Sequence, residues 1–343
     1  MKNIRPGFIL PSAALTVPPK LARAYDPALD RPPRMGDLVY GRIDYVGEHS
    51  SLENKHGRIH AITDGSRAVF VYGNRYAPDA FEGVVPERFE RAADLLARSG
   101  MIGRMRVKNS STKDPTKVEV LGYVVDESGH VVNTRDHPVA KPAKSMIAGR
   151  RRSRMVLHVG TSMNSGKSTS AMASCWALSS MGHAVRASKV TGTASLKDIL
   201  HMQDAGAERI SDFSHLGYPS TYLLEEADLL GIFRDLDGKF ANNPSKYWVV
   251  ELADGILQRE TAMLLRDESV RGRIHRLVFS ASDAFGAIGG IRILREEFGL
   301  EPDAISGRCS SSPLMIRELH EWTKIPVFDN RTRDLRALSE ILI

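Results

Sequence analysis

The sequence predicts an α/β protein with a mostly parallel sheet covered by helices on both faces, preceded by a small β-rich, barrel-like domain. In the second half, continuous apolar runs alternate with longer segments of helical spacing, a pattern typical of parallel strands joined by right-handed crossovers. In the first half, short β-branched and aromatic runs are separated by Gly, Asn, Asp and Ser. A chain of 343 residues is long enough for both domains.

Changes in composition set the expected domain boundaries. Residues 1–35 are rich in proline and arginine without a sustained period, which predicts an irregular arm. Residues 36–135 form the expected β-rich accessory domain. Residues 136–153 are polar, basic and twice interrupted by proline, so we expect a basic linker there. Residues 154–343 then form the α/β domain.

The β-rich domain is predicted from runs that end at turn-forming residues. The expected strands are 37–46, 57–63, 67–73, 100–109, 117–126 and 130–133, with a hairpin turn at 126–129. Residues 86–100, "PERFERAADLLARSG", place apolar side chains at helical intervals and stop at a glycine, so we expect a capped helix there.

In the α/β domain, each apolar strand precedes a helical segment. The expected strands are 154–160, 183–190, 247–252, 276–281, 303–307 and 325–329. The clearest helical segments are 166–182 and 286–299.

Composition and charge exclude several classes of protein. With 42% hydrophobic and 26% charged residues and no apolar run of about 18, the chain is expected to be a globular protein without a membrane span. Cys175 and Cys309 do not make a disulfide framework, so a cytoplasmic location is expected. Up to Ser153 there are 25 Lys and Arg against 17 Asp and Glu, an excess of eight, whereas the remainder has 22 against 24. The basic half could serve a nucleic acid, although a solvated basic face is the commoner explanation.

A glycine-rich turn follows the first strand of the α/β domain. In "GTSMNSGKS" (160–168), five residues separate Gly160 from Gly166, one more than in the usual Walker A pattern, and Thr161 stands at the first glycine position. A strand leads in and a helix begins at the Gly-Lys pair, so free amides and the helix dipole would face an anion. The predicted nucleotide-binding residues are Gly160, Thr161, Asn164, Ser165, Gly166, Lys167, Ser168 and Thr169. Lys167 would reach the terminal phosphates, and Ser168 would hold Mg²⁺.

The longer loop with threonine after the first glycine resembles that of dethiobiotin synthetase and its relatives, which are P-loop NTPases that activate substrates with ATP. The resemblance covers residues 155–330 and includes "ASKVTGT" (187–193) and "YWVVELADG" (247–255). The chain is also similar to a related, poorly characterised group of P-loop proteins with a "TG" turn and a "DF" pair, here Thr191-Gly192 and Asp212-Phe213.

The resemblance implies roles for residues outside the loop. Lys189 would face the terminal phosphate and the substrate, Thr191 and Thr193 would help hold the acceptor, and Glu251 would bind Mg²⁺. A second carboxylate near the metal is expected after the second strand. Asp204 is preferred by spacing, and Asp212 is the alternative, since it could instead cap a helix. The family's adenine-contacting asparagine is absent from "SGRCSSS", so ATP is the expected nucleotide only by resemblance.

Three functions fit these observations. The preferred one is a dethiobiotin-synthetase-like enzyme that uses ATP and Mg²⁺ to activate a small-molecule substrate by phosphoryl transfer. The alternatives are a kinase acting on a nucleotide or nucleic acid, and a nucleotide-gated binding or assembly protein. A homodimer is also expected. Other candidate sites are weaker: His56 and His60 lack a third zinc ligand nearby in sequence, and His158 is expected to pack inside its strand.

Overall fold

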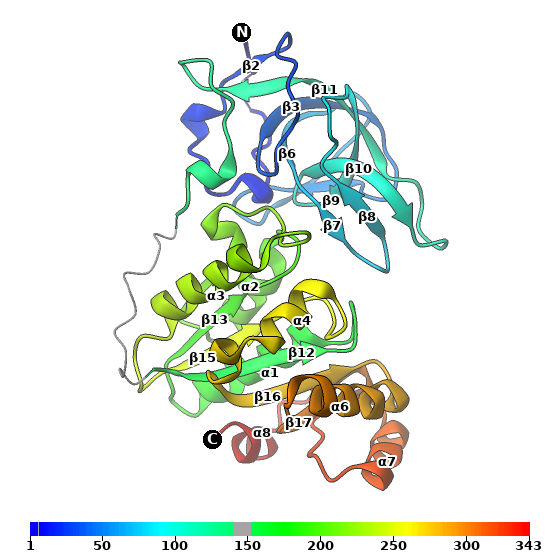
Figure 1. The fold of residues 1–343 in the computed structure, drawn as a ribbon, viewed down its shortest axis with the longest axis vertical. Coiled ribbons are helices and arrows are strands. Elements are labelled where there is room, and N and C mark those ends of the chain that lie inside the picture. The colour runs from blue at the N-terminus through cyan, green and yellow to red at the C-terminus, as the bar shows by residue number, and fades with distance from the viewer. Residues whose placement is uncertain (6, 140–151) are drawn as a thin grey trace. The chain divides into compact units, whose positions relative to one another are not determined.

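A computed structural model describes residues 1–5, 7–139 and 152–343, which form two compact units (Figure 1). The β-rich unit comprises Met1–Lys141, Thr193–Lys197 and Phe213–Leu223. The α/β unit comprises Pro142–Gly192, Asp198–Asp212 and Leu224–Ile343. Most of the expected linker, residues 136–153, lies outside the described residues.

The β-rich unit contains a closed barrel, which confirms the expected barrel-like architecture. Its strands pair in a ring in the order β3, β6, β10, β9 and β11, returning to β3. The β6–β10 pair is parallel and the other pairs are antiparallel. Closure removes free strand edges from the ring. The ring strands are β3 (Leu38–Tyr45), β6 (Arg67–Tyr72), β9 (Ala92–Ala97), β10 (Met101–Lys108) and β11 (Thr116–Val125).

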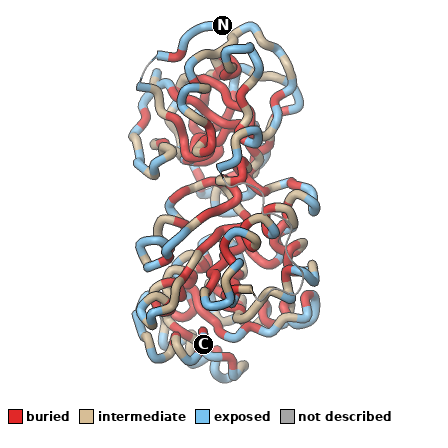
Figure 2. The backbone as a smooth tube through the Cα atoms, turned by 90° about the vertical axis from the view of Figure 1, so that its left-hand side faces the viewer, coloured by how far each residue is buried: buried red, intermediate tan, exposed pale blue. Residues whose placement is uncertain are grey.

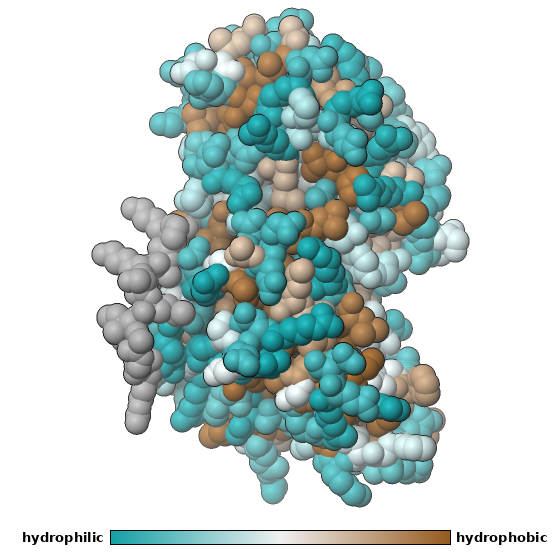
Figure 3. All heavy atoms as spheres, in the orientation of Figure 1, coloured by the Kyte–Doolittle hydropathy of each residue, from teal (hydrophilic) through white to brown (hydrophobic). Residues whose placement is uncertain are grey.

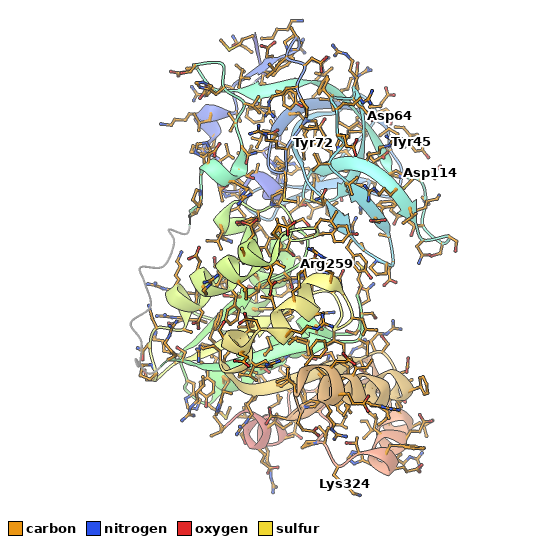
Figure 4. The ribbon with its side chains drawn as sticks, viewed as in Figure 1. Tyr45, Asp64, Tyr72, Asp114, Arg259 and Lys324 are labelled. Carbon is orange, nitrogen blue, oxygen red and sulfur yellow. The ribbon has the colours of Figure 1, made fainter. Side chains whose placement is uncertain are left out.

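Short elements surround the barrel, and alternate residues of its strands fill its core. Tyr72, labelled in Figure 4, is buried there together with Phe70 and Tyr123. Buried backbone runs through the barrel strands in Figure 2. The surrounding elements are β1 (Lys2–Asn3), β2 (Ala24–Asp26), β4 (Ser51–Glu53), β5 (Ile59–Ala61), β7 (Arg75–Tyr76), β8 (Phe81–Val84), η1 (Ser12–Ala14), η2 (Pro19–Leu21) and η3 (Thr134–Asp136).

Three expectations for this unit are corrected. The helix expected at 86–100 is a loop followed by β9, because β9 closes the barrel between β10 and β11 and buries Leu95 in its core. Residues 1–35 are not merely an irregular arm, since β2 pairs with β11. Residues 130–133 form only isolated bridges, although the turn at 126–129 is confirmed by the Gly129 amide donating to the Asp126 carbonyl.

The α/β unit is built on a 6-stranded parallel sheet in the order β14-β13-β15-β12-β16-β17, which confirms the expected parallel sheet. Its strands are β12 (Arg154–Gly160), β13 (Val185–Lys189), β14 (Arg209–Asp212), β15 (Tyr247–Glu251), β16 (Ile274–Ala281) and β17 (Ala304–Gly307). Its helices are α1 (Lys167–Ser180), α2 (Leu196–Asp204), α3 (Glu226–Phe240), α4 (Arg259–Arg266), α5 (Glu268–Arg271), α6 (Ala284–Phe298), α7 (Pro313–Trp322) and α8 (Leu335–Leu342), with the short η5 (Arg308–Ser311). The first two residues of α2 belong to the β-rich unit.

Helices cover both faces of this sheet, because alternate strand residues point to opposite sides. One face packs Val156 and Val249 against α1 and α8 in a single apolar cluster. On the other face, Trp248 contacts Phe233 of α3, and Phe279 lies against α6. Among the described residues no helix is both long and apolar enough to cross a bilayer, and hydrophilic residues dominate the face drawn in Figure 3.

Two strand expectations for this sheet are corrected. Residues 325–329 make a single bridge from Val327 to Ile305 and not a strand. The missing strand is β14, "RISD", which lies at the sheet edge next to β13. An edge strand contacts only one neighbour, so it can be short and polar and lacks the apolar run that identifies a central strand.

Two loops of the α/β chain belong to the β-rich unit. Residues 193–197 follow β13, and residues 213–223, which include η4 (Phe213–Leu216), follow β14. Inside the β-rich unit, Thr134 Oγ1 donates to the Gly217 carbonyl at 2.6 Å, and the Tyr222 hydroxyl donates to Glu82 Oε1 at 2.8 Å. The chain therefore crosses between the units at the carboxyl ends of two neighbouring strands.

Helix α6 gives a test of the sheet packing. A Cβ at Gly290 would lie 2.1 Å from Phe279 Cζ, so Gly290→Ala is expected to lower the free energy of unfolding by about 1–3 kcal/mol through overpacking. Nothing lies within 4 Å of a Cβ at the exposed Gly289, so Gly289→Ala is expected to raise it by about 0.5–1 kcal/mol. Urea unfolding of the two variants checks the opposite signs, and equal shifts would contradict this helix placement.

Candidate functional site

The turn between β12 and α1 contains backbone in the left-handed region. Two residues in this turn have positive φ, Asn164 at 59° and Gly166 at 103°, and Gly166 precedes the first residue of α1. Thr161 is not among the positive-φ residues, so a threonine fits at that position of the longer loop. A Cβ at Gly160 would lie 2.6 Å from the Ser280 carbonyl, so this close approach requires glycine.

The loop packs against the end of β17 and the segment after it. A Cβ at Gly166 would lie 2.8 Å from Gly307 Cα, which shows how closely the two backbones approach. The Arg308 amide donates to the Ser165 carbonyl at 3.0 Å. Asn330 Nδ2 donates to the Gly166 carbonyl at 3.2 Å and to Ser170 Oγ at 3.0 Å. These hydrogen bonds hold the loop through its carbonyl oxygens, so none of them uses an amide of the loop.

The loop holds a buried lysine and two buried hydroxyls. Lys167 is 5% exposed and donates to the Ser162 carbonyl at 2.6 Å, across the loop. Burial lowers the pKa of Lys167, against the attraction of Glu251. The buried hydroxyls of Thr161 and Ser165 have no hydrogen-bond partner among the described residues. Buried donors without partners are costly, so they favour a polar ligand at this position.

Four polar residues form a row across the carboxyl ends of adjacent strands. Asp212 pairs in register with Lys189, Lys189 with Glu251, and Glu251 with His158. Residues in register on neighbouring strands lie about 5 Å apart and point to the same face. Val156 and Val249, two residues before His158 and Glu251, pack against α1, so the row lies on the α1 face.

The row connects to the loop through hydrogen bonds. Ser168 Oγ donates to Glu251 Oε1 at 3.0 Å, and Lys189 Nζ lies 3.9 Å from the same oxygen. Lys189 Nζ also donates to Asp198 Oδ2 at 2.5 Å. Burial raises the pKa of Glu251, although the charge of Lys189 opposes this shift. Burial opposes the charged form of Lys189, but Asp198 and Glu251 raise its pKa above the ordinary value.

Two carboxylates other than Asp204 lie beside Lys189. Asp204 is exposed at the last residue of α2, and the chain just after it, at Glu208, bonds to the carbonyl of Val185, the first residue of β13. The amino end of β13 is at the sheet edge opposite the loop between β12 and α1, so Asp204 lies away from that loop. Asp198, in the first turn of α2, contacts Lys189, and Asp212 lies buried in the row.

The expected acceptor-binding threonines differ in their surroundings. Thr191 is fully buried, and its Oγ1 accepts a hydrogen bond at 2.9 Å from the Ala253 amide, in the turn after β15. Thr193 belongs to the β-rich unit, where it forms a bridge with Ser220. Thr169 is exposed in the first turn of α1.

The site also contains Asp198, which the sequence did not single out, and His158, which is packed inside its strand as expected. Asp198 follows Leu196 in the first turn of α2, but its contact with Lys189 depends on where that helix starts. His158 is completely buried, and neither ring nitrogen has a hydrogen-bond partner in the described part of the chain.

The donor set suits a hard cation such as Mg²⁺. Glu251 Oε2 is buried and has no hydrogen-bond partner within the described residues, and Ser168 Oγ lies beside Oε1 of the same side chain. Mg²⁺ usually takes one or two protein oxygens together with phosphates and waters. In the described ranges, no group of three His, Cys, Asp or Glu could hold a metal ion.

Comparisons with solved structures give partial matches at low sequence identity. No protein-family model and no curated protein matches the chain. A ParA family ATPase from Chlorobium tepidum TLS is 14% identical with a TM-score of 0.35, over 52% of this chain and 82% of that one. A duf1611 family protein from Anabaena variabilis is 15% identical with a TM-score of 0.39, over 59% and 63%. The signal recognition particle receptor FtsY from Elizabethkingia anophelis, in complex with GDP, is 12% identical with a TM-score of 0.33, over 51% and 59%. The match therefore spans less than two thirds of the last two proteins.

Proposed function

We propose that the chain binds a Mg²⁺–nucleoside triphosphate, with ATP as the first candidate, and transfers its terminal phosphoryl group to a small-molecule acceptor. The observation that carries the proposal is the loop from Gly160 to Ser168, with its buried lysine and with two buried hydroxyls that lack a partner among the described residues. Lys167 points across the turn to the Ser162 carbonyl, where a phosphate oxygen would replace that acceptor. The N-terminus of α1 adds free amides and a positive dipole end to the same place.

The residues of the row would stabilise the negative charge that develops on the phosphoryl group during transfer. Ser168 Oγ and Glu251 would hold Mg²⁺, which would supply positive charge next to the phosphates. Lys189 keeps its proton, since two carboxylates raise its pKa, and so presents a fixed positive charge at the sheet edge. Fixed charges in a dry site stabilise a phosphoryl transition state more strongly than they would in water.

A ligase-like reaction is the form of transfer that we favour, on the resemblance to dethiobiotin synthetase. A carboxylate or carbamate oxygen of the acceptor would form a bond to the terminal phosphorus. The bond from that phosphorus to the leaving nucleoside diphosphate would break at the same time. An amine of the substrate would then displace phosphate from the resulting acyl phosphate. Thr191, in the turn after β13, is a candidate for holding this acceptor.

Nucleotide binding and acceptor choice can be separated by experiment. Calorimetry with Mg²⁺ and non-hydrolysable ATP or GTP analogues tests the first, and the absence of heat with either would overturn the proposal. Phosphate release and phosphorylated product are then measured across carboxylates, amines and hydroxyl compounds. Phosphate released with a carboxylate supports the ligase-like form, a stable phosphate ester identifies a kinase, and tight binding without turnover identifies a nucleotide-gated binding protein.

Proton competition at Glu251 gives a pH prediction. Because burial raises the pKa of Glu251, the folded chain holds this proton at a pH where a free carboxylate would have lost it. Mg²⁺ must displace the proton, so apparent Mg²⁺ affinity is expected to fall by up to about tenfold per pH unit below that pKa. Melting temperature with a non-hydrolysable triphosphate, with and without Mg²⁺, measures the effect between pH 8 and pH 5.

The matched variant for this prediction is Glu251→Gln, which resembles the protonated side chain. Its Mg²⁺-dependent increase in melting temperature is expected to be small at every pH. Without ligand, the sign reverses: ionising a group whose folded pKa is raised lowers stability, so Glu251→Gln should exceed the wild type in stability at pH 8 and lose that advantage toward pH 4.5. A Mg²⁺ response in the wild type that does not change with pH would contradict the assignment.

A further inference from the structure

Helix α6 exposes a large aromatic side chain near its amino end. Phe285 is 91% exposed, whereas Ile291, Leu294 and Phe298 of the same helix are buried. Single exposed apolar residues are common on protein surfaces, so Phe285 alone indicates nothing. Its position on the helix is informative, because it begins a row of residues that leads to an apolar groove.

The groove lies between α4 and α6, within the α/β unit (Figure 1). Its volume is about 420 Å³, and its apolar lining includes Ile256, Met263, Ile293 and Phe298. Leu257, which borders the groove, is 72% exposed. One water molecule takes up roughly 30 Å³ in the liquid, so the groove has room for an aromatic side chain.

Phe285 and the groove lie on one row of α6. Residues four apart on a helix lie on the same side, so Phe285, Gly289 and Ile293 follow one another along the surface. Phe285 lies about 12 Å from Ile293 along the helix axis. Among the described residues, no atom lies within 4 Å of a Cβ placed at Gly289. The row therefore has a protruding ring at one end, a groove at the other and no side chain between them.

This surface is complementary in shape to a second copy of itself. When two α6 helices cross antiparallel at Gly289, a twofold axis passes through the crossing, and each Phe285 meets the groove of the other copy beside Ile293. Both contacts form at once, because the axis exchanges the two copies. Packed helices usually have axes about 8–10 Å apart, and a glycine at the crossing permits the shorter distance.

Charge favours the same antiparallel arrangement. Glu296 and Glu297 are exposed in the last turn of α6. The amino end of a helix is the positive end of its dipole, and the carboxyl end is negative. An antiparallel crossing turns the acidic end of each α6 toward the positive end of the other, whereas a parallel crossing would bring like ends together.

We propose that the α/β unit binds a second copy of this chain through α6, with Phe285 of each copy in the α4–α6 groove of the other. The two copies use the same surface, so the contact closes as a dimer and does not extend into a fibre. A single pair of helices buries less than the roughly 800 Å² per partner of a standard interface, so the dimer is expected to be reversible. The contact involves no nucleotide, so this inference does not depend on the proposed function.

The first test follows the mass of the nucleotide-free full chain against concentration by sedimentation velocity. The wild type is expected to change from one chain to two as the concentration rises. Phe285→Ala should weaken association by about a hundredfold or more, because each dimer loses two buried rings. Trp322→Ala is the matched control, since it removes an aromatic side chain that is 76% exposed on α7, and it should associate as the wild type does.

Gly289→Arg tests the crossing point without disturbing the single chain. Because a Cβ there meets no neighbour and arginine favours helix, the variant should unfold no more easily than the wild type. Its long side chain would hold two α6 helices apart, so the variant should stay a single chain at every concentration. Gly289→Ala adds only one methyl group and should weaken association much less.

Gly289→Cys tests the twofold axis directly. Cys175 and Cys309 are both buried, so they do not compete with a thiol at position 289. A disulfide requires Cα atoms about 4.4–6.8 Å apart, and two copies of position 289 meet at the proposed axis. Mild oxidation should therefore join two chains of this variant. Leu314→Cys, at an exposed position on α7, is the control and should give far less covalent dimer.

Three results would overturn the proposal. The first is a wild type that stays a single chain at every concentration, which would leave the groove to a helix of a different protein. The second is a dimer that Phe285→Ala and Gly289→Arg leave intact, because its contact would then lie on another surface. The third is equal crosslinking of the two cysteine variants, which would show random collision. None of these results bears on nucleotide binding, which calorimetry decides separately.

Discussion

Lys167→Ala is expected to abolish triphosphate-dependent phosphate release and to weaken nucleotide binding by at least about a hundredfold. The Lys167 side chain crosses the loop from α1 to the Ser162 carbonyl, so alanine would remove the positive charge that the proposed terminal phosphate would contact. Calorimetry with a non-hydrolysable analogue and a phosphate-release assay measure the two effects.

The same substitution should leave the fold nearly unchanged in stability. Burial lowers the pKa of Lys167, which shows that the folded chain disfavours this charge, and its removal offsets the loss of the Ser162 bond and of packing by the aliphatic stem. Without ligand, the melting temperature is expected to stay within a few degrees of the wild type. Lys324→Ala removes an equal charge at an exposed position, labelled in Figure 4, and should leave binding intact. Wild-type affinity in Lys167→Ala would contradict a phosphate loop.

The parts of the site that were predictable are those set by adjacent residues. The loop from Gly160 to Ser168 and the strand ends at Lys189 and Glu251 each depend on a strand of known direction and the few residues after it. Because parallel strands end at one sheet edge, the sequence alone places Lys189 and Glu251 at the same edge. The Asp198 contact was not predictable in this way, since it depends on the residue at which α2 begins, and that residue is capped by Glu53 from a distant segment.

The errors in the fold have the same origin. Residues 92–97 have apolar positions that suit a helix as well as a strand. They form the strand β9 because they pair with both β10 and β11. The short polar run "RISD" forms the strand β14 because its backbone pairs with β13 at the edge of the sheet. Local pattern therefore predicts central strands and loops, whereas closure of a barrel and the sheet edge depend on contacts that the pattern does not contain.

His158 should make the protein sensitive to acid. Burial lowers the pKa of His158 to about 3, whereas an unfolded histidine titrates near its ordinary value of 6.5. Between these values the unfolded chain binds a proton that the folded chain does not, so the free energy of unfolding falls as pH falls, by about 1.4 kcal/mol per pH unit from this group. The stability that depends on neutral His158 is fully present above pH 6.5 and is lost toward pH 3.

His158→Leu tests this by replacing the imidazole with an apolar side chain of similar size. Urea unfolding from pH 7 to pH 4 should show a shallower decline in the variant, by about the slope of one proton. Glu251, in register with His158, has a raised pKa and opposes the decline in both proteins, so the difference between the curves isolates the histidine. At pH 7 leucine should also stabilise the fold, because both imidazole nitrogens are buried without a hydrogen-bond partner among the described residues. Parallel curves would mean that His158 is accessible to protons in the folded chain, and that the strand next to the phosphate loop is less tightly closed than its burial indicates.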